Sequence, residues 1–455
     1  MKLITLSLLL SITYQKHVDF SLHREPIKKA NNHPIVLSTE QDVVDKAIES
    51  MEQSINFYTD IYIGSGRQRF KAILDTNISP IIVALTDCDQ CVNNTQFAYL
   101  NSSTAGFFDP LRGQTYLPRD DYYPTYTQST YQGSYLTDDV CLSENVCAKN
   151  YSIFGIVEGP AITDADGVLG LRPGPGPIDN SSFMEHLVEQ GVIGSSMFGL
   201  YVSPDVTKSV SSESKIRFGG IDQDLKDDKL FSDDVSYFSL IQLDTWHLRL
   251  YSATFGGKSI FNGLASTVEF NPSTPFIAVT PSHFEQIAKT VQSEETGMKC
   301  YNNQACVRMG DCKVYEGVKV TFKIGDSDAE GAQEFEIDAR NLMVSSKDLD
   351  SMAFKIGDYE EYCVLGIIGT VPESSKKYVM GNLFLSNFYT LFDADHQRIG
   401  FSIKLTEKPI LTKSLFIWFG IAAGVLLVLI IGIKVWKRKK ESDLQKKLDS
   451  MAELL

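Results

Sequence analysis

Residues 57–77 read FYTDIYIGSGRQRFKAILDTN, and this stretch decides the fold class. Apolar and polar residues alternate through Phe57 to Gly64 and again from Arg69 to Asp75, which is the period of a β-strand with one buried face. Between these runs, Gly64-Ser-Gly-Arg67 supplies turn residues. The stretch therefore predicts two strands joined by a tight turn and ending in the polar triplet Asp75-Thr76-Asn77.

The chain from about Ser54 to Lys404 continues in short apolar runs rich in Tyr, Phe, Val, Ile and Thr, separated by Gly, Pro, Asn and Asp. This texture predicts an all-β domain. A segment of this length exceeds what one hydrophobic core usually serves, so two β lobes are expected, residues 51–235 and 236–405. Helices should be few: one over Ser182 to Gln190, and one that opens at Ser282 with Glu285 completing a capping box.

The two halves of this domain share a pattern. In the first half the triplet Asp75-Thr-Asn is followed by Gly167-Val-Leu-Gly170, and in the second half Asn271-Pro-Ser is followed by Tyr378-Val-Met-Gly381. Each half thus pairs a polar triplet at a strand end with a later apolar segment that ends in glycine. The pattern indicates two structurally related lobes.

The termini predict a membrane protein. Lys2 precedes an apolar run from Leu3 to Ile12, as in a signal peptide over residues 1–15. Residues 16–50 show no strong periodicity and form a pro-segment or a linker. Residues 414–433 carry no charge and are long enough to span a bilayer, after a short stalk at 406–413.

The residues after this span set its orientation. The tail at 434–455 begins with a basic cluster, which marks the cytosolic side. The expectation is a single-pass type I membrane protein whose folded part is extracellular or lumenal. Gly420 and Gly424 form a GxxxG pair that either supports dimerisation of the helix or arises by chance in a span that tolerates glycine.

Eight cysteines divide evenly between the halves, which predicts disulfides within each lobe and an oxidising compartment. In the first lobe local pairs are expected, Cys88 with Cys91 and Cys141 with Cys147. For the second lobe the pairing stays open among Cys300, Cys306, Cys312 and Cys363. The Cys88-x-x-Cys91 spacing also occurs in zinc and thioredoxin-like sites, but no second CxxC and no βαβ pattern accompany it. Glycosylation sequons fit a secreted surface and lie at Asn77, Asn93, Asn101, Asn150 and Asn180.

Charge and missing motifs exclude several functions. The formal net charge is −15, and the tail's seven basic against four acidic residues leave −18 for the remainder, so nucleic acid is not an expected partner. The sequence has no HExxH, no GxSxG and no catalytic-cysteine signature. Neither a metal nor a cofactor is expected.

Taken together, these segments resemble the pepsin-like aspartic endopeptidases over nearly the whole region between the termini. Ala72-Ile-Leu-Asp75-Thr76-Asn77 is similar to the family's first active-site triplet, and Asp166-Gly-Val-Leu-Gly-Leu171 to its DGILGL segment. Further matches in family order are Phe183 to Ile193, Arg217-Phe-Gly-Gly-Ile-Asp222 and Tyr378 to Phe401. The resemblance implies a bilobal fold of two β-barrel-like lobes, a long peptide-binding cleft between them and a hairpin flap over the cleft.

The resemblance also implies catalysis by two aspartates that share a proton, one as base and one as acid. Asp75 matches the first, with Thr76 beside it and Asn77 in place of the usual glycine. The second triplet departs from the family, because the segment from Val268 to Pro281 contains no Asp. Asn271 is the best match to the missing acid.

Two alternatives to Asn271 remain at the second triplet. Counting back from Pro281 without a gap puts Pro272 at the position, and neither residue titrates. Glu269 shares a strand face with Asn271 but should sit too far along the strand to replace the acid. Pro272 also removes the hydroxyl with which the family, together with the threonine of the first lobe, locks the two loops.

The flap tyrosine has two candidates in the stretch Tyr126-Thr-Gln-Ser-Thr-Tyr-Gln-Gly133. Alignment back from Asp138 selects Tyr126 as the substrate-contacting residue, and Tyr131 competes. A packing role is an equal expectation for either ring. Thr127 and Ser129 replace the glycines usual in this hairpin, which predicts a stiffer or differently shaped flap.

Three functions follow from these residues. The first is a membrane-anchored active endopeptidase, supported by Asp75 and Thr76. The second is a protease-like protein whose cleft holds an extended peptide by strand-like hydrogen bonds but cuts it weakly or not at all, because Asn271 replaces the second Asp. The third is a surface-interaction protein without a cleft ligand. The missing carboxylate favours the second.

Overall fold

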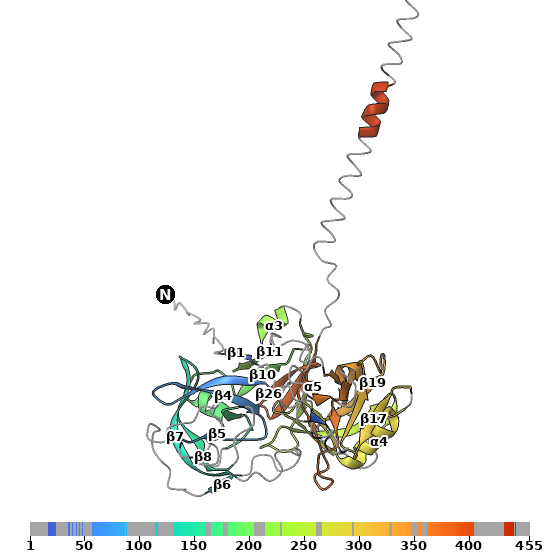
Figure 1. Ribbon diagram of the computed structural model, residues 1–455. Coiled ribbons are helices and arrows are strands. Elements are labelled where there is room, and N and C mark those ends of the chain that lie inside the picture. The colour runs from blue at the N-terminus through green and yellow to red at the C-terminus, as the bar shows by residue number, and fades with distance from the viewer. Residues whose placement is uncertain are drawn as a thin grey trace, which may run out of the picture. The chain divides into compact units, whose positions relative to one another are not determined.

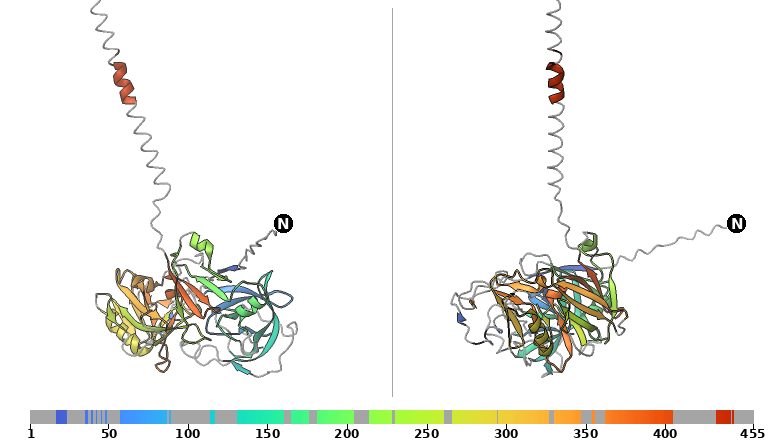
Figure 2. Two further views of the ribbon diagram at one scale, coloured as in Figure 1. Left: turned by 180° about the vertical axis from the view of Figure 1, so that it is seen from behind. Right: turned by 90° about the vertical axis from the view of Figure 1, so that its right-hand side faces the viewer.

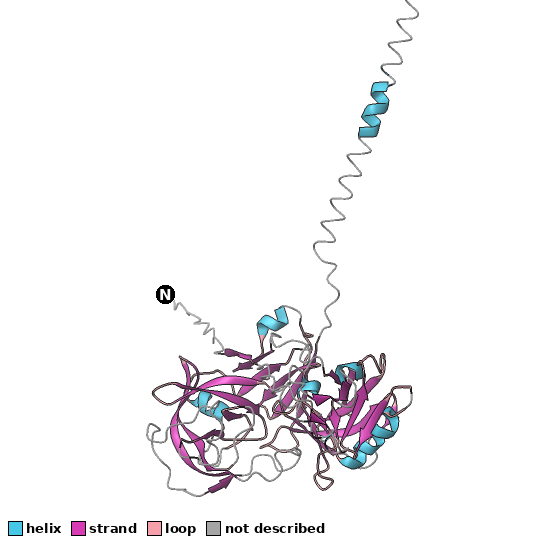
Figure 3. Cartoon of the chain, in the orientation of Figure 1, coloured by secondary structure: helices cyan, strands magenta, loops and turns pink. Residues whose placement is uncertain are grey.

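The computed structural model of the protein describes residues 17–23, 57–88, 114–116, 131–159, 165–175, 181–203, 214–260, 266–346 and 362–404, apart from gaps of a few residues, with short pieces at 35–36, 354–355 and 432–440 and isolated positions at 39, 42, 45, 48 and 442. Within these ranges the chain is mostly strand with few helices (Figure 3). It divides into a unit from Met1 to Lys404 and a second unit from Leu405 to Leu455.

The first half forms a seven-stranded sheet that contains the two predicted strands. Tyr58–Ile63 alternates half-buried and buried residues, and it pairs antiparallel with the next strand through the predicted turn, in which Arg67 adopts φ 52°. In spatial order the strands are β3 (Tyr58–Ile63), β4 (Gln68–Asp75), β9 (Gly167–Gly170), β5 (Ile81–Ala84), β8 (Val146–Glu158), β7 (Tyr131–Ser143) and β6 (Gln114–Tyr116).

The second half forms an eight-stranded sheet. Its path runs β20 (Gln333–Asp338), β19 (Lys319–Gly325), β13 (His247–Phe255), β15 (Ser266–Phe270), β25 (Lys377–Met380), β16 (Ile277–Ala278) and β24 (Ile367–Ile368), with β14 (Lys258–Ser259) paired to β13. A four-stranded sheet accompanies it in the order β17 (Met298–Tyr301), β18 (Ala305–Met309), β23 (Tyr362–Leu365) and β21 (Met343–Ser345).

A six-stranded sheet draws strands from both halves and lies between their own sheets (Figures 1 and 2). Its order is β1 (Val18–Leu22), β11 (Ser214–Phe218), β10 (Met197–Tyr201), β26 (Phe388–Asp393), β27 (Arg398–Ile403) and β12 (Ser236–Ser239). At the β10–β26 junction the rings of Phe198 and Phe392 stack 4.5 Å apart, and both are buried. These buried, stacked rings pack the first half against the second half.

A small parallel pair is formed by β2 (Ile35–Val36) and β22 (Phe354–Lys355).

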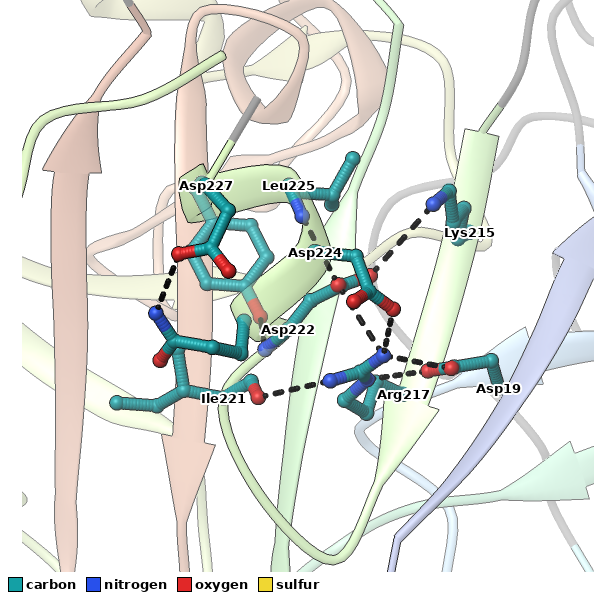
Figure 4. Close-up of polar contacts among 10 residues, drawn as sticks. Asp19, Lys215, Arg217, Ile221, Asp222, Asp224, Leu225 and Asp227 are labelled. Atoms are coloured by element: carbon teal, nitrogen blue, oxygen red, sulfur yellow. Dashed lines mark hydrogen bonds and ion pairs between the residues drawn. The ribbon is translucent and has the colours of Figure 1, made fainter. Parts of the chain in front are cut away.

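Strand β1 belongs to residues 16–50, for which the sequence predicts a pro-segment or linker. Its Asp19 forms an ion pair with Arg217 of β11, whose side chain is only 2% exposed (Figure 4). Asp222 and Asp224 also contact this guanidinium, at 3.2 and 3.0 Å. Because a buried arginine needs compensating charge, this cluster fixes the edge strand to the sheet.

Helices are short and follow the strands closely: α2 (Phe183–Glu189), α3 (Gln223–Asp227), α4 (Pro281–Val291), α5 (Asn382–Leu385) and the 3₁₀ turn η1 (Ala339–Leu342). The helix predicted over Ser182 to Gln190 is confirmed, with a reciprocal capping box between Ser182 and Glu185.

The capping box predicted at Ser282 is wrong. Helix α4 has Thr280 at its N-cap, and the backbone and hydroxyl of Ser282 bind the carboxylate of Glu373 at 2.6 and 2.8 Å. Glu285 pairs instead with Lys289, one turn further along. A carboxylate from a distant part of the chain therefore occupies the helix N-terminus that a local residue was expected to cap.

Disulfides lie within each half, as predicted. Cys141 bonds Cys147, and the second-half pairs are Cys300–Cys306 and Cys312–Cys363. Cys88 is also disulfide-bonded, and its expected partner Cys91 lies outside the described residues. Three of the five sequon asparagines, Asn93, Asn101 and Asn180, fall there too.

Of the predicted membrane span at 414–433, only the last two residues belong to the described part of the chain. A search of the described residues finds no helix with the length and apolar character to cross a membrane. The helix at 432–440 is exposed along its length. Gly420 and Gly424 lie outside the described residues, as does the signal-peptide region.

Candidate active site

The Asp75 loop follows strand β4 in the first half. Asp75 is fully buried and ends the strand opposite Gly170 of the parallel strand β9. The backbone N–H of Asn77 donates to Asp75 Oδ1 at 2.8 Å. Asn77 is absent from the described residues with positive φ, so this loop does not use the conformational tolerance that asparagine offers in place of glycine.

The Asn271 loop follows strand β15 in the second half. Asn271 is fully buried, and its backbone N–H donates to Met380 of the parallel strand β25 at 3.0 Å. Its side-chain oxygen accepts from the N–H of Ser273 at 3.1 Å and from the Ser273 hydroxyl at 2.7 Å. The turn thus repeats the one made by Asp75 and Asn77.

Strand register shows which residue of the second loop corresponds to Asp75. In the first half, Ile82 lies seven residues after Asp75 and pairs with Val168, two residues before Gly170. In the second half, Ala278 lies seven residues after Asn271 and pairs with Val379, two residues before Gly381. The correspondence has no gap, so Asn271 occupies the position of Asp75 and the alternative placement of Pro272 is wrong.

The structure brings Asp75 and Asn271 into direct contact. Asn271 Nδ2 donates to Asp75 Oδ1 at 3.0 Å, across 196 residues of sequence. Asp75 Oδ1 therefore receives two N–H groups, one from each loop. An ionised carboxylate can accept both, whereas the amide has no proton that it can share or transfer as an acid.

A second contact ties the loops together. The hydroxyl of Thr76 donates to the backbone oxygen of Phe270 at 2.6 Å. Pro272, which stands at the corresponding position of the second loop, carries no hydroxyl for the reciprocal bond. Its backbone oxygen instead accepts from Asn382 Nδ2 at 2.9 Å. One half of the expected lock is thus present, and Pro272 offers no side-chain donor for the other half.

Glu269 is a site residue whose importance the sequence understated. It is buried on β15, and its Oε1 lies 3.3 Å from Asn271 Nδ2. Its Oε2 lies 3.0 Å from Lys377 Nζ and 3.3 Å from His247 Nε2. The sequence did show a glutamate inside an apolar strand, which indicates a buried charge. It did not show the basic partners of this glutamate, because they come from two other strands.

The remaining site predictions concern the flap. Tyr126, predicted to contact substrate, lies outside the described residues. Tyr131 is 3% exposed and packs in an apolar cluster with Ile73, Tyr135 and Phe154. Its surroundings are those of a core residue. The same burial raises the pKa of the neighbouring Tyr135 to about 12.

A cavity of about 640 Å³ opens elsewhere in the first half, between β1, β3 and the end of β7. Asp19, His23, Tyr62 and Glu144 are among its lining residues, and neither Asp75 nor Asn271 is. Since it does not reach the paired loops, this cavity is not the candidate active site.

Comparison with known proteins agrees with the geometry. Residues 56–404 match the model of the eukaryotic aspartyl protease family. Pepsin A of Gallus gallus is 23% identical over 84% of this chain and 99% of its own length. Renin-2 of Mus musculus is 21% identical over 80% of this chain and 83% of its own, and aspartic protease 1 of Toxoplasma gondii is 22% identical over 76% and 55%. This chain belongs to the eukaryotic aspartyl protease family.

Proposed function

We propose that this protein is a membrane-anchored member of the family that holds an extended peptide between its lobes and cleaves it weakly or not at all. One observation carries the proposal: the group that faces Asp75 from the corresponding loop of the second half is the amide of Asn271, at 3.0 Å. The activity of an aspartic protease depends on two carboxylates at these positions.

The chemistry of the pair explains the expected loss. With two carboxylates, one binds and deprotonates water while the other, protonated, polarises the peptide carbonyl. Asp75 supplies a base, and Asn271 supplies only N–H donors and a carbonyl acceptor. Loss of one member of an acid–base pair typically lowers the rate by ~10² to 10⁴, so residual cleavage is expected to be slow.

Retained architecture supports peptide binding. The two loops keep their turns, their parallel strand partners and the Thr76 contact, so the groups around the missing acid remain in place. Extended peptides bind by main-chain hydrogen bonds that do not require the second carboxylate. Family membership and relatives called pepsin A and renin-2 support a peptide or protein as the ligand.

The sequence supports anchoring at the C-terminus. The uncharged segment at 414–433 is followed by Lys434, Lys437, Arg438, Lys439 and Lys440. Such a span with basic residues on one side orients the tail to the cytosol. Disulfides in both halves suit the lumenal or extracellular placement that this orientation and the N-terminal apolar run require.

A specific observation keeps active proteolysis as a second candidate. Asp75 remains buried at the end of its strand, and the hydroxyl of Thr76 still bridges to the other loop. A carboxylate base in this position could support cleavage if an acid came from the substrate or from solvent.

Cleavage profiling separates the two candidates. The full-length chain, purified in detergent, is incubated with a peptide library from pH 3 to pH 8 alongside Asp75→Asn, and fluorescence anisotropy measures binding of peptides whose scissile amide is replaced by a hydroxyl-bearing isostere. The expected result is peptide binding with Asp75-dependent cleavage that is slow or undetectable. Efficient cleavage by the wild type that disappears in Asp75→Asn would establish the endopeptidase instead.

A further inference from the structure

Glu269 distinguishes the two halves as clearly as Asn271 does. It stands two residues before Asn271, where the first half has Ile73 two residues before Asp75. Ile73 packs in an apolar cluster with Ile82 and Val168, whereas Glu269 puts a carboxylate into the corresponding buried place. Residues two apart on a strand share a face, so this carboxylate lies on the same side as the catalytic position.

The hydrogen bonds of Asn271 fix the orientation of its amide. Nδ2 donates to Asp75 Oδ1 and to Glu269 Oε1, and Oδ1 accepts two bonds from Ser273. In the flipped amide, the oxygen would face two carboxylates and the nitrogen would face the backbone N–H of Ser273. Glu269 thus occupies the second of the two N–H groups that the amide possesses.

The cost of burying the Glu269 carboxylate is offset by the charge of Lys377 and by a contact with His247. Lys377 comes from β25 and His247 from β13, the two strands that flank β15, and both approach Glu269 Oε2. Their side chains are each 12% exposed. Both basic groups engage Oε2, at 3.0 and 3.3 Å, which leaves Oε1 directed at the amide.

From these contacts we infer that Glu269 is a positioning residue: it holds the Asn271 amide against Asp75 and leaves that amide no N–H for a ligand in the site. The inference rests on the proposed function and deepens it, because it assigns the loss of proteolysis to two residues. Restoring only the carboxylate at position 271 would set an oxygen where Nδ2 now lies, 3.3 Å from Glu269 Oε1. Two such oxygens repel unless one binds a proton, which competes with the proton shared with Asp75.

One experiment measures the amide directly and needs no proteolysis. Two peptides are compared for binding to the full-length protein, one with a hydroxyl at the isostere position and one with that hydroxyl removed. The variant is Glu269→Ile combined with Lys377→Met, so that the lysine is not left without its carboxylate partner, and Glu269→Gln is a second variant that keeps the side-chain shape. Glu336→Gln, on the exposed face of β20, is the matched control.

The hydroxyl preference is the Kd of the peptide without the hydroxyl divided by the Kd of the peptide with it. This ratio should rise five- to tenfold in the Glu269→Ile, Lys377→Met variant, because one N–H of Asn271 becomes available to the ligand. The control should match the wild type. An unchanged preference in both Glu269 variants would overturn the inference and leave the proposed function standing, since that function is tested by peptide binding and cleavage of the wild type.

A second readout uses the repaired site. In the Asn271→Asp background, replacing Glu269 and Lys377 as above should raise kcat for peptide cleavage at acidic pH at least tenfold with KM within about twofold, and should shift the pH optimum downward. Glu269→Gln should rescue in part, because its amide can donate to the introduced carboxylate. Equal kcat and equal pH profiles with and without Glu269 would count against the inference.

Discussion

The Asp75 loop and the Asn271 loop make the same turn with different chemistry. In each, the side-chain oxygen accepts the N–H of the residue two positions later, from Asn77 at 2.8 Å and from Ser273 at 3.1 Å. Each loop also lies against a glycine at the end of a parallel strand, Gly170 as the last residue of β9 or Gly381 directly after β25. Backbone geometry and acid–base chemistry are therefore separable properties, since the second loop makes the same turn with an amide where the first loop has a carboxylate.

Side chains around the turns show where the second loop has changed. The first loop has Ile73 before the acid and a threonine after it, and this threonine bridges to Phe270. The second loop has Glu269 before the amide and a proline after it. Three positions thus differ together, and the changes at Glu269 and Asn271 form one hydrogen-bonded group that reaches Lys377. The second loop therefore differs from the first by a connected set of buried polar contacts, and not by a single substitution.

Placing a carboxylate at position 271 should have the largest effect of the changes that compare the two loops. Asn271→Asp should raise kcat/KM for peptide cleavage at acidic pH about 10²-fold, equivalent to ~2.7 kcal/mol of transition-state stabilisation, because the pair regains an acid. Adding Asp75→Asn to this variant should abolish the gain. If Asn271→Asp stays inactive even with Glu269 and Lys377 replaced as above, the two backbones are not equivalent where catalysis requires it.

Gly170 and Gly381 pack against the two loops, and substituting them tests whether both loop backbones are held equally tightly. A Cβ at Gly381 would lie 2.2 Å from the oxygen of Thr274, and one at Gly170 would lie 2.5 Å from that of Pro80. Each Gly→Ala change should therefore destabilise the protein by ~2 to 3 kcal/mol, measured by chemical unfolding. Gly66→Ala is the control, because nothing lies within 4 Å of its added Cβ. A large loss at one glycine only would show that one loop is held less tightly.

Local sequence patterns predicted more of the fold than of the candidate site. Alternation predicted β3 and β4, and the register of both halves follows from the same pattern of polar triplet and glycine. Glu269 was underestimated because its partners, His247 and Lys377, reach it across strands and leave no mark near it in sequence. The capping box at Ser282 failed for the same reason, since Glu373 acts from 91 residues away. Strand β1 was not predicted, because its place depends on the contact of Asp19 with Arg217.

The contact between the loops gives a smaller effect. Thr76→Val keeps the side-chain shape and removes the buried bond to the oxygen of Phe270, so it should lower the free energy of unfolding by ~1 to 2 kcal/mol. Pro272→Thr restores a hydroxyl at the corresponding position, but it also removes the restriction that proline places on the unfolded chain. It should therefore change stability by less than ~0.5 kcal/mol. If Pro272→Thr raised the free energy of unfolding by as much as Thr76→Val lowers it, the second loop could form the reciprocal hydrogen bond as soon as a hydroxyl is supplied.

The smallest effect concerns which half responds to mild acid. The second loop leads into α4, where the ring of His283 packs edge-on against Tyr378, 5.6 Å between centroids. Burial lowers the pKa of His283, and the nearby Glu373 opposes this only partly. A histidine with a lowered pKa in the folded state binds its proton more readily when unfolded, so folding loses stability as the pH falls below about 6.5. Between pH 7.5 and pH 5.5, the unfolding midpoint of His283→Phe should fall by about 1 to 2 °C less than that of the wild type. His186→Phe, on α2 of the first half, is the comparison variant, and an equal change in both would mean that this response does not belong to the second half.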